Sequence, residues 1–135
     1  MNLIEQLKEQ EGYRQFPYKC SEGVSTIAYG RNLETNGIDE EEAEYLLSRD
    51  VDKCRAKLGL NVGFFSELDP VRQDALINMA YQLGVAGLMK FKNMMFCLNA
   101  ADYSGAAIEA MDSRWARQTP ARAKEVSEMI RTGSY

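Results

Sequence analysis

The sequence predicts a mainly helical α+β protein in which a short β-hairpin near the amino terminus is followed by a series of helices. Between positions 16 and 29, two runs rich in aromatic and β-branched residues flank a turn of Ser, Glu, Gly and Val. From position 39 onward, apolar residues recur at helical spacing, with proline and glycine near the expected ends. At 135 residues the chain is long enough to bury one core, so we expect a single domain.

The first helix is expected over residues 2–11. Asn2 is the candidate N-cap, Glu5 completes a capping box, and Gly12 ends the helix as a left-handed residue. Glu11 therefore lies at the carboxyl end of a helix, where the negative end of the helix dipole raises the pKa of a carboxyl group. A proton donor that works at neutral pH needs such an environment. The apolar stripe of this helix is formed by Leu3, Ile4 and Leu7.

The hairpin follows directly. We expect its strands at 16–20 and 25–29, joined by a turn at residues 21–24. Gly30 is expected to end the second strand. Cys20 and Thr26 then lie on facing strands next to the turn. This arrangement lets a thiol and a hydroxyl flank one substrate atom.

The remainder of the chain is expected to be helical. A long helix is predicted from about Asp39 to about Leu58, with Glu42 in its capping box and Gly59 as its stop. In the linker 59–68, Phe64 and Phe65 are expected to point into the core. Further helices are predicted from Asp69 and Pro70 to Gly84, from Met89 to Leu98, from Tyr103 to Met111, and from Thr119 and Pro120 to the residue before Gly133.

Composition excludes several classes of protein. Histidine is absent, so His-dependent proteases, His general bases and His-ligated zinc sites cannot be built. The three cysteines, Cys20, Cys54 and Cys97, are odd in number and form no CxxC pair, which argues against a disulfide framework or a thiolate metal site. A net charge of −4 argues against nucleic-acid binding, and no apolar run approaches a membrane span. No signal peptide is visible, so we expect a cytoplasmic protein. Because the residue types that usually bind metals are missing or unpaired, we also expect no metal or cofactor.

The spacing of three residues resembles a known catalytic pattern. Glu11, Cys20 and Thr26 are separated by eight and five residues, as in the phage-type lysozymes of glycoside hydrolase family twenty-four, in which an acidic residue or a cysteine takes the middle position. Arg31 departs from the family, which commonly has histidine there, and the segment 33–38 is shorter than in the T-even phage members. The resemblance extends through TIAYGRNL, DEEEAEYLLSRDVD, ALINMAYQLG, SRWARQTPARAK and RTGSY.

The resemblance implies a lysozyme-like fold with a small hairpin lobe at about 12–38 and a connecting helix at about 39–58. A larger helical lobe would comprise about 60–135 together with the helix at 2–11. The implied activity is that of an endolysin, an N-acetylmuramidase that cuts the β-1,4 bond between N-acetylmuramic acid and N-acetylglucosamine in bacterial peptidoglycan. The implied setting is a monomer without a cofactor or membrane contact, kept in the host cytoplasm until a separate phage pore protein lets it reach the periplasm and cell wall.

The resemblance also implies roles for individual residues. Glu11 would be the general acid, while Cys20 and Thr26 would align and polarise the attacking water, or the Cys20 thiolate would attack directly; Glu22 in the turn is an alternative base. Arg122 corresponds to the arginine that pairs with the catalytic glutamate. A different class of function stays open, namely a wall-binding or regulatory module that has lost turnover, because the second carboxylate is missing. The residues implied to bind substrate are Tyr81, Gln82, Thr119 and Arg122.

Overall fold

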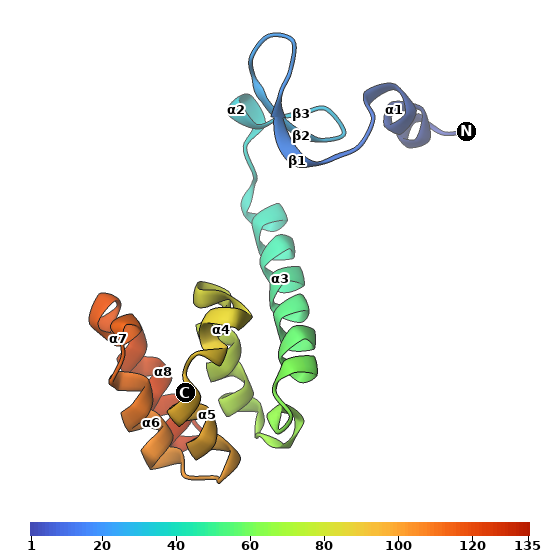
Figure 1. Ribbon diagram of the computed structural model, residues 1–135. Coiled ribbons are helices and arrows are strands. Elements are labelled where there is room, and N and C mark those ends of the chain that lie inside the picture. Colours follow the sequence, from blue (N-terminus) through green and yellow to red (C-terminus); the bar gives the residue numbers. More distant parts are fainter. The chain divides into compact units, whose positions relative to one another are not determined.

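The computed structural model describes residues 1–135 and consists of two compact units, Met1–Leu46 and Leu47–Tyr135, each described below by itself (Figure 1). The first unit holds a three-stranded antiparallel sheet, and the second is entirely helical. The predicted mainly helical α+β class is thus confirmed. No helix combines the length and the apolar character that crossing a bilayer requires.

Helix α1, Leu3–Glu11, begins and ends as predicted. The Asn2 side chain accepts a hydrogen bond from the Glu5 amide at 2.9 Å, and the Glu5 carboxylate accepts one from the Asn2 amide at 3.1 Å. Gly12 ends the helix with φ +73° and ψ 155°. Its positive φ agrees with the prediction, but its ψ lies outside the left-handed helical region, in a conformation that glycine alone adopts readily. No residue of α1 is buried.

The predicted hairpin is confirmed as β1, Arg14–Lys19, and β2, Ser25–Ala28. Tyr18 faces Thr26 and Lys19 faces Ser25, and the register shifts between Arg14 and Tyr18. This irregularity contains Pro17, which lacks the N–H that a regular ladder would use. A third strand, β3 at Arg31–Asn32, and the one-turn helix α2 at Leu33–Asn36 were not predicted, since both are too short to show periodicity.

Helix α3, Glu40–Asn61, begins with the predicted capping box. Asp39 Oδ1 accepts from the Glu42 amide at 2.8 Å, and Glu42 Oε1 accepts from the Asp39 amide at 3.1 Å. The predicted stop at Gly59 is wrong, because the helix continues to Asn61. Glycine inside a helix costs only about 1 kcal/mol, and the turn is kept by burial of Leu58 and by its carbonyl, which accepts from the Val62 amide at 2.8 Å.

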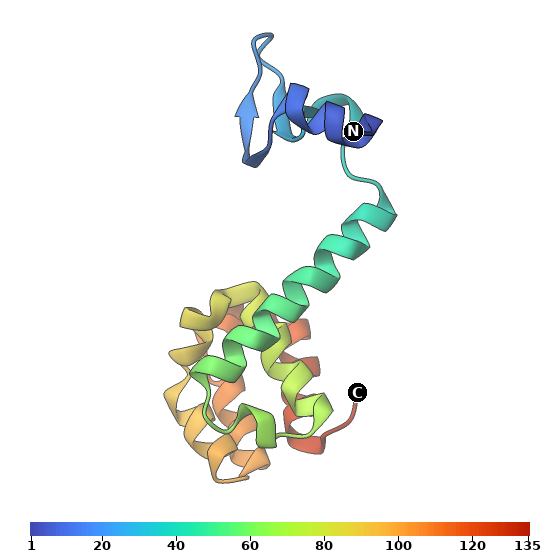
Figure 2. The ribbon, with the colours of Figure 1, turned by 90° about the vertical axis from the view of Figure 1, so that its right-hand side faces the viewer.

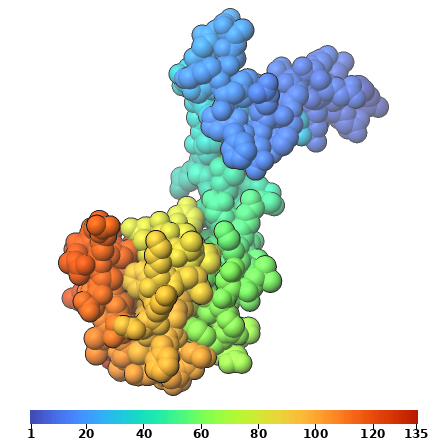
Figure 3. Space-filling view, in the orientation of Figure 1, coloured from blue at the N-terminus to red at the C-terminus, as the bar shows by residue number.

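The helices of the second unit pack around one apolar core. After a short 3-10 turn, η1 at Phe65–Glu67, they are α4 (Pro70–Met89), α5 (Lys92–Asn99), α6 (Tyr103–Met111), α7 (Arg114–Gln118) and α8 (Pro120–Thr132). Helix α8 packs against α4, α6 and α7, and α5 packs against α6; Figure 2 shows these helices side by side. In the space-filling view of Figure 3 their side chains close the gaps between the ribbons. The largest fully buried side chains are Leu58, Leu76, Met79, Leu88, Met94, Val126 and Ile130.

Most predicted features of these helices are confirmed. The side chain of Asp69 caps α4, with Pro70 in its first turn; α6 has the predicted bounds; and Gly133 ends α8 in the left-handed conformation. Phe65 is buried, and Phe64 is partly buried against the same core. Gly84 kinks α4 with φ +76° rather than ending it, because the chain resumes the helix through Met89.

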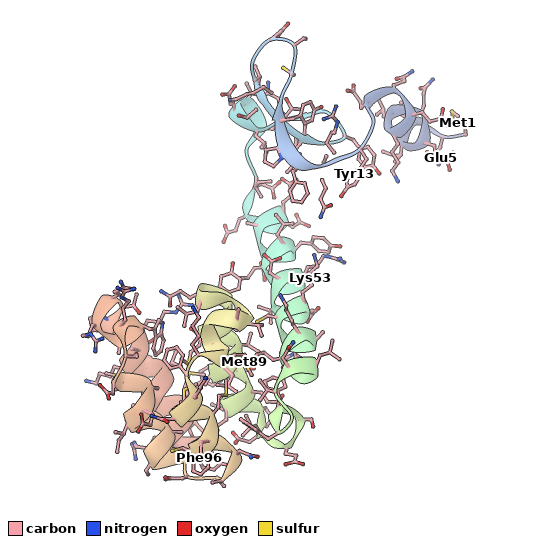
Figure 4. All side chains as sticks on the ribbon, in the orientation of Figure 1. Met1, Glu5, Tyr13, Lys53, Met89 and Phe96 are labelled. Atoms are coloured by element: carbon pink, nitrogen blue, oxygen red, sulfur yellow. The ribbon has the colours of Figure 1, made fainter.

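The helix predicted from Met89 onward is partly wrong. Met89 belongs to the end of α4, and α5 starts only at Lys92. Met94 is fully buried, whereas Phe96, labelled in Figure 4, is 77% exposed. Helix α7 was missed because it has only five residues.

Candidate active site

The carboxyl group of Glu11 lies against the backbone of Gly30 in the turn between β2 and β3. A Cβ atom placed on Gly30 would lie 3.0 Å from Glu11 Cδ and would overlap Glu11 Oε2. Gly30 has φ +68°, a conformation that favours glycine, and any side chain at this position would displace the Glu11 carboxyl group from where it lies. The Glu11 side chain is exposed to solvent while resting on this turn.

Aromatic contacts hold the end of α1 against the same turn. The rings of Tyr13 and Tyr29 are 5.6 Å apart and tilted by 46°, and Lys8 Nζ lies 5.6 Å from the centre of the Tyr29 ring. Tyr13, labelled in Figure 4, follows the end of α1 directly. Tyr29 therefore contacts residues on both sides of Glu11, and these contacts fix the end of the helix beside Gly30.

The Cys20 thiol is held by the backbone of its own turn. Cys20 donates its amide hydrogen to the Val24 carbonyl at 2.9 Å, and its own carbonyl accepts from the Gly23 amide at 2.8 Å. Hydrogen bonds to the sulfur from the backbone N–H of Val24 and then of Glu22 lower the pKa of the Cys20 thiol, and the Thr26 hydroxyl contributes in the same direction. Partial desolvation and the charge of Glu22 oppose this shift without cancelling it. The turn thus favours the thiolate.

Thr26 lies on the same face of the hairpin as Cys20. Thr26 is paired with Tyr18, and Cys20 follows Tyr18 by two residues, so the side chains of Cys20 and Thr26 are diagonal neighbours. Thr26 is 95% buried, and its hydroxyl donates to the Val24 carbonyl at 2.9 Å. A hydroxyl has only one proton, so its donation to the Cys20 sulfur is an alternative to the Val24 bond. In the structure the hydroxyl is oriented toward Val24.

Arg31 braces the loop that leads into α3. Its guanidinium donates to the Gly37 carbonyl through Nε at 3.1 Å and Nη2 at 3.0 Å, and Nη2 lies 3.1 Å from Glu42 Oε1. Glu42 is also the capping residue of α3. Arg31 therefore has a structural role within the first unit, at the position where the family commonly has histidine.

In the second unit, two of the predicted substrate residues join one hydrogen-bonded chain. Trp115 Nε1 donates to Gln82 Oε1 at 2.8 Å, and the Thr119 hydroxyl donates to the Trp115 carbonyl at 2.9 Å. Trp115 is buried and meets the Phe91 ring edge-on at 6.1 Å. The Thr119 hydroxyl is therefore bonded to the backbone of α7, and the Thr119 side chain does not cap α8.

The other two predicted residues, Tyr81 and Arg122, line a hollow of about 360 Å³ between α3, α4 and α8. Arg122 donates through Nε to Asn78 Oδ1 at 2.9 Å and through Nη2 to the Asn78 carbonyl at 3.1 Å. Tyr81 is half exposed. Nowhere does the chain gather three or more Cys, Asp or Glu side chains in a way that could hold a metal ion.

The predicted site residues thus fall into two groups. Glu11, Cys20 and Thr26 are placed by the hairpin unit, and Tyr81, Gln82, Thr119 and Arg122 by the helical unit. The pairing of Arg122 with Glu11 stays a prediction from the family resemblance. Two residues of the site were missed. Gly30 could have been found as the glycine that breaks the second strand, and Asn78 as the residue three positions before Tyr81 on one face of a helix.

Comparison with known proteins gives several relatives. The chain is 32% identical to the pre-baseplate central spike protein of Enterobacteria phage T4, over 99% of this chain but only 28% of the spike protein. It is 28% identical to the protein named "Probable T4-type lysozyme 1" of Dictyostelium discoideum, over 98% of this chain and 95% of that protein. An endolysin of Acyrthosiphon pisum secondary endosymbiont phage 1 is 29% identical over 82% of this chain and 75% of its own length.

The first two alignments run over 166 and 162 positions, more than the 135 residues of this chain, so both relatives contain residues without a counterpart here. The family model for phage lysozyme matches residues 8–131 and therefore includes every predicted site residue. The chain belongs to the phage lysozyme family.

Proposed function

We propose that this protein is a lysozyme-type glycoside hydrolase, an endolysin that cuts the β-1,4 bond between N-acetylmuramic acid and N-acetylglucosamine in bacterial peptidoglycan. The observation that carries the proposal is the hairpin of the first unit. The turn after its second strand supports the Glu11 carboxyl group at Gly30, and the turn at its tip holds a thiol with a lowered pKa beside a buried threonine hydroxyl. The chain that carries these groups belongs to the phage lysozyme family.

Cleavage of a glycosidic bond needs two groups on opposite sides of the sugar. One protonates the leaving oxygen, and the other activates water or attacks the anomeric carbon. Glu11 is the proton donor in this proposal. Its carboxyl group is exposed, so a glycosidic oxygen can approach it, while its position is fixed by the contacts at Gly30 and Tyr29.

Cys20 and Thr26 take the opposite side. Because the Thr26 proton is donated to the Val24 carbonyl, both lone pairs of the hydroxyl oxygen can accept a hydrogen bond from water. The Cys20 thiolate then removes a proton from that water as the water oxygen bonds to the anomeric carbon. At the same time the bond from the anomeric carbon to the leaving oxygen breaks, and that oxygen takes the Glu11 proton. Proton exchange with solvent afterwards returns both groups to their starting states.

Direct attack by the Cys20 thiolate is the second route. A carbon–sulfur bond would form as the glycosidic bond breaks, and water would hydrolyse this thioglycoside in a second step, with Glu11 as base. The orientation of the Thr26 hydroxyl favours the route through water. The two routes differ in the anomer that is released first, because one displacement inverts the anomeric centre and two retain it.

A wall-binding module without turnover is the alternative function. Two findings favour it: the second carboxylate of most glycosidases is replaced by Cys20, and one relative is a spike protein of which this chain covers only 28%. Glu22 offers a carboxylate in the same turn, and its backbone N–H already donates a hydrogen bond to the Cys20 sulfur. The phage pore protein, the monomeric state and retention in the host cytoplasm before lysis belong to the same proposal as expectations from the resemblance.

A turbidity assay on permeabilised bacteria separates the two functions. We expect the parent protein to clear the suspension and Glu11→Gln to leave it turbid, with both proteins equally folded by circular dichroism. If the parent sediments with the walls and never clears them, the binding module is correct. If Glu11→Gln clears the suspension at the parent rate, Glu11 is not the proton donor.

A further inference from the structure

Arg122 sits where a cation is electrostatically disfavoured. It is the third residue of α8, which begins at Pro120, and the amino end of a helix carries the positive end of the helix dipole. The side chain is nevertheless half buried. An arginine in this place needs acceptors to hold it, and the two oxygen atoms that accept its hydrogen bonds both belong to Asn78 of α4.

The two hydrogen bonds from Arg122 define its orientation. Nε donates to Asn78 Oδ1 at 2.9 Å and Nη2 donates to the Asn78 carbonyl at 3.1 Å. A guanidinium has five N–H groups in one plane, so two bonds on adjacent nitrogens fix the plane. They leave both N–H groups of Nη1 and the second N–H of Nη2 without a partner in the protein. These remaining groups form the edge that matches a carboxylate with two parallel hydrogen bonds.

Asn78 and Arg122 line the same hollow of about 360 Å³, whose wall also includes Tyr81. Asp74 is the other charged residue of this lining, and it already accepts a hydrogen bond from the Tyr135 hydroxyl at 2.5 Å and lies 4.0 Å from Arg55. Arg122 is thus the one cation that this hollow offers to an incoming anion.

We propose that Asn78 is a positioning residue that holds the guanidinium of Arg122 with its outer edge ready for a carboxylate. This inference rests on the proposed function for the reaction that it serves. The carboxylate has two possible sources: Glu11, as the family resemblance implies, or a carboxylate on the peptide part of the peptidoglycan. Asn78 acts in either case through Arg122 and makes no contact with the reacting atoms itself.

The first test is independent of activity. The Nε–H of Arg122 can be followed by proton–nitrogen NMR, with Arg122→Ala to assign its signal. We expect the parent signal to exchange slowly with water, Asn78→Asp to keep that protection because its oxygen still accepts, and Asn78→Leu to lose it. Protection that is unchanged in Asn78→Leu would overturn the proposal.

The second test is a double-mutant cycle on peptidoglycan hydrolysis. We expect Asn78→Leu to lower kcat/KM about tenfold, because this is the size of effect that the loss of one hydrogen bond to a charged group produces. The same change made in Arg122→Ala should then have no further effect. Equal effects of Asn78→Leu with and without Arg122 would contradict the proposal, because they would mean that Asn78 acts only on folding.

Gln73→Leu is the matched control for this cycle. Gln73 also lies on α4 and donates its side chain to the Phe65 and Leu68 carbonyls at 3.0 Å and 3.1 Å, away from Arg122. We expect Gln73→Leu to lower the melting temperature while keeping kcat/KM at the parent value below that temperature. If Asn78→Leu lowers kcat, the carboxylate that Arg122 binds is that of Glu11. If Asn78→Leu raises KM at constant kcat, the carboxylate belongs to the substrate. If the parent hydrolyses nothing, the proposed function fails, while the NMR result still decides the role of Asn78.

Discussion

The carboxyl group of Glu11 packs on the Cα atom of Gly30, so closely that no side chain fits between them. Glu11 ends a helix and Gly30 forms the turn between β2 and β3, so this contact connects the two elements on which the proposed chemistry depends. Tyr29 supports it through Lys8 and Tyr13. The position of the proton donor is therefore set by a backbone surface as well as by its own helix.

Substitution of Gly30 should remove activity by displacing Glu11. In Gly30→Ala the new methyl group would occupy the place of the carboxyl oxygen, and a positive φ costs an alanine about 1 to 2 kcal/mol. Gly37→Ala is the matched control, because Gly37 also has a positive φ of 57° but nothing lies within 4 Å of its would-be Cβ.

We expect both variants to lose similar stability in urea unfolding, and only Gly30→Ala to lose hydrolysis. Equal hydrolysis by the two variants, measured well below their midpoints, would show that the contact at Gly30 does not position Glu11.

The three cysteines should react with iodoacetamide in a definite order. Backbone N–H groups lower the pKa of Cys20, whereas burial raises the pKa of Cys54, and burial together with the charges of Asp102 and Glu109 raises that of Cys97. Thiolate is the reactive form, so as the pH rises from neutral, Cys20 should be alkylated first and with a midpoint below that of an ordinary cysteine. Mass spectrometry of peptides after short exposures measures the order. Simultaneous labelling of all three would mean that the turn does not favour the thiolate.

Thr26 should depend on its hydroxyl for activity and for stability. Thr26→Val keeps the shape of the buried side chain but removes one of the two hydrogen bonds that the Val24 carbonyl accepts, while the bond from the Cys20 amide remains. This loss should cost about 1 kcal/mol in unfolding free energy. Thr26→Ser retains the hydroxyl and should recover most of the hydrolysis. The role proposed for Thr26 would be wrong if Thr26→Val hydrolysed walls as fast as Thr26→Ser.

Much of this fold follows from local signals in the sequence. The capping residues Asn2, Asp39 and Asp69 and the terminal Gly133 each act within one turn of their own helix, so their effects were predictable. The stop predicted at Gly59 failed because the burial of Leu58 outweighs the cost of one helical glycine.

The residues of the candidate site could be predicted only where their spacing along the chain matched the pattern of the family. Glu11, Cys20 and Thr26 lie in one continuous stretch of the chain, and a hairpin in this register brings the last two together. The contact of Glu11 with Gly30 and the hold of Asn78 on Arg122 join residues 19 and 44 positions apart. Such contacts depend on packing between elements, which no local pattern encodes.

Ser127 should be replaceable with a gain in stability. Its hydroxyl is buried and has no hydrogen-bond partner, a state that costs about 1 kcal/mol or more. Ser127→Ala should therefore raise the melting temperature by about 3 °C, whereas Ser48→Ala, at an exposed helical position, reports the effect of helix propensity alone. A gain in Ser127→Ala no larger than that in Ser48→Ala would show that the hydroxyl finds a partner.

Mass spectrometry and NMR of the fragments released from purified peptidoglycan test the central claim most directly. The account predicts fragments that end in a reducing N-acetylmuramic acid, appearing with the parent protein and absent with Glu11→Gln. It also predicts that the first anomer released is inverted relative to the β-linked wall. Fragments that end in N-acetylglucosamine, a product made equally well by Glu11→Gln, or no cleavage by the parent would contradict the account.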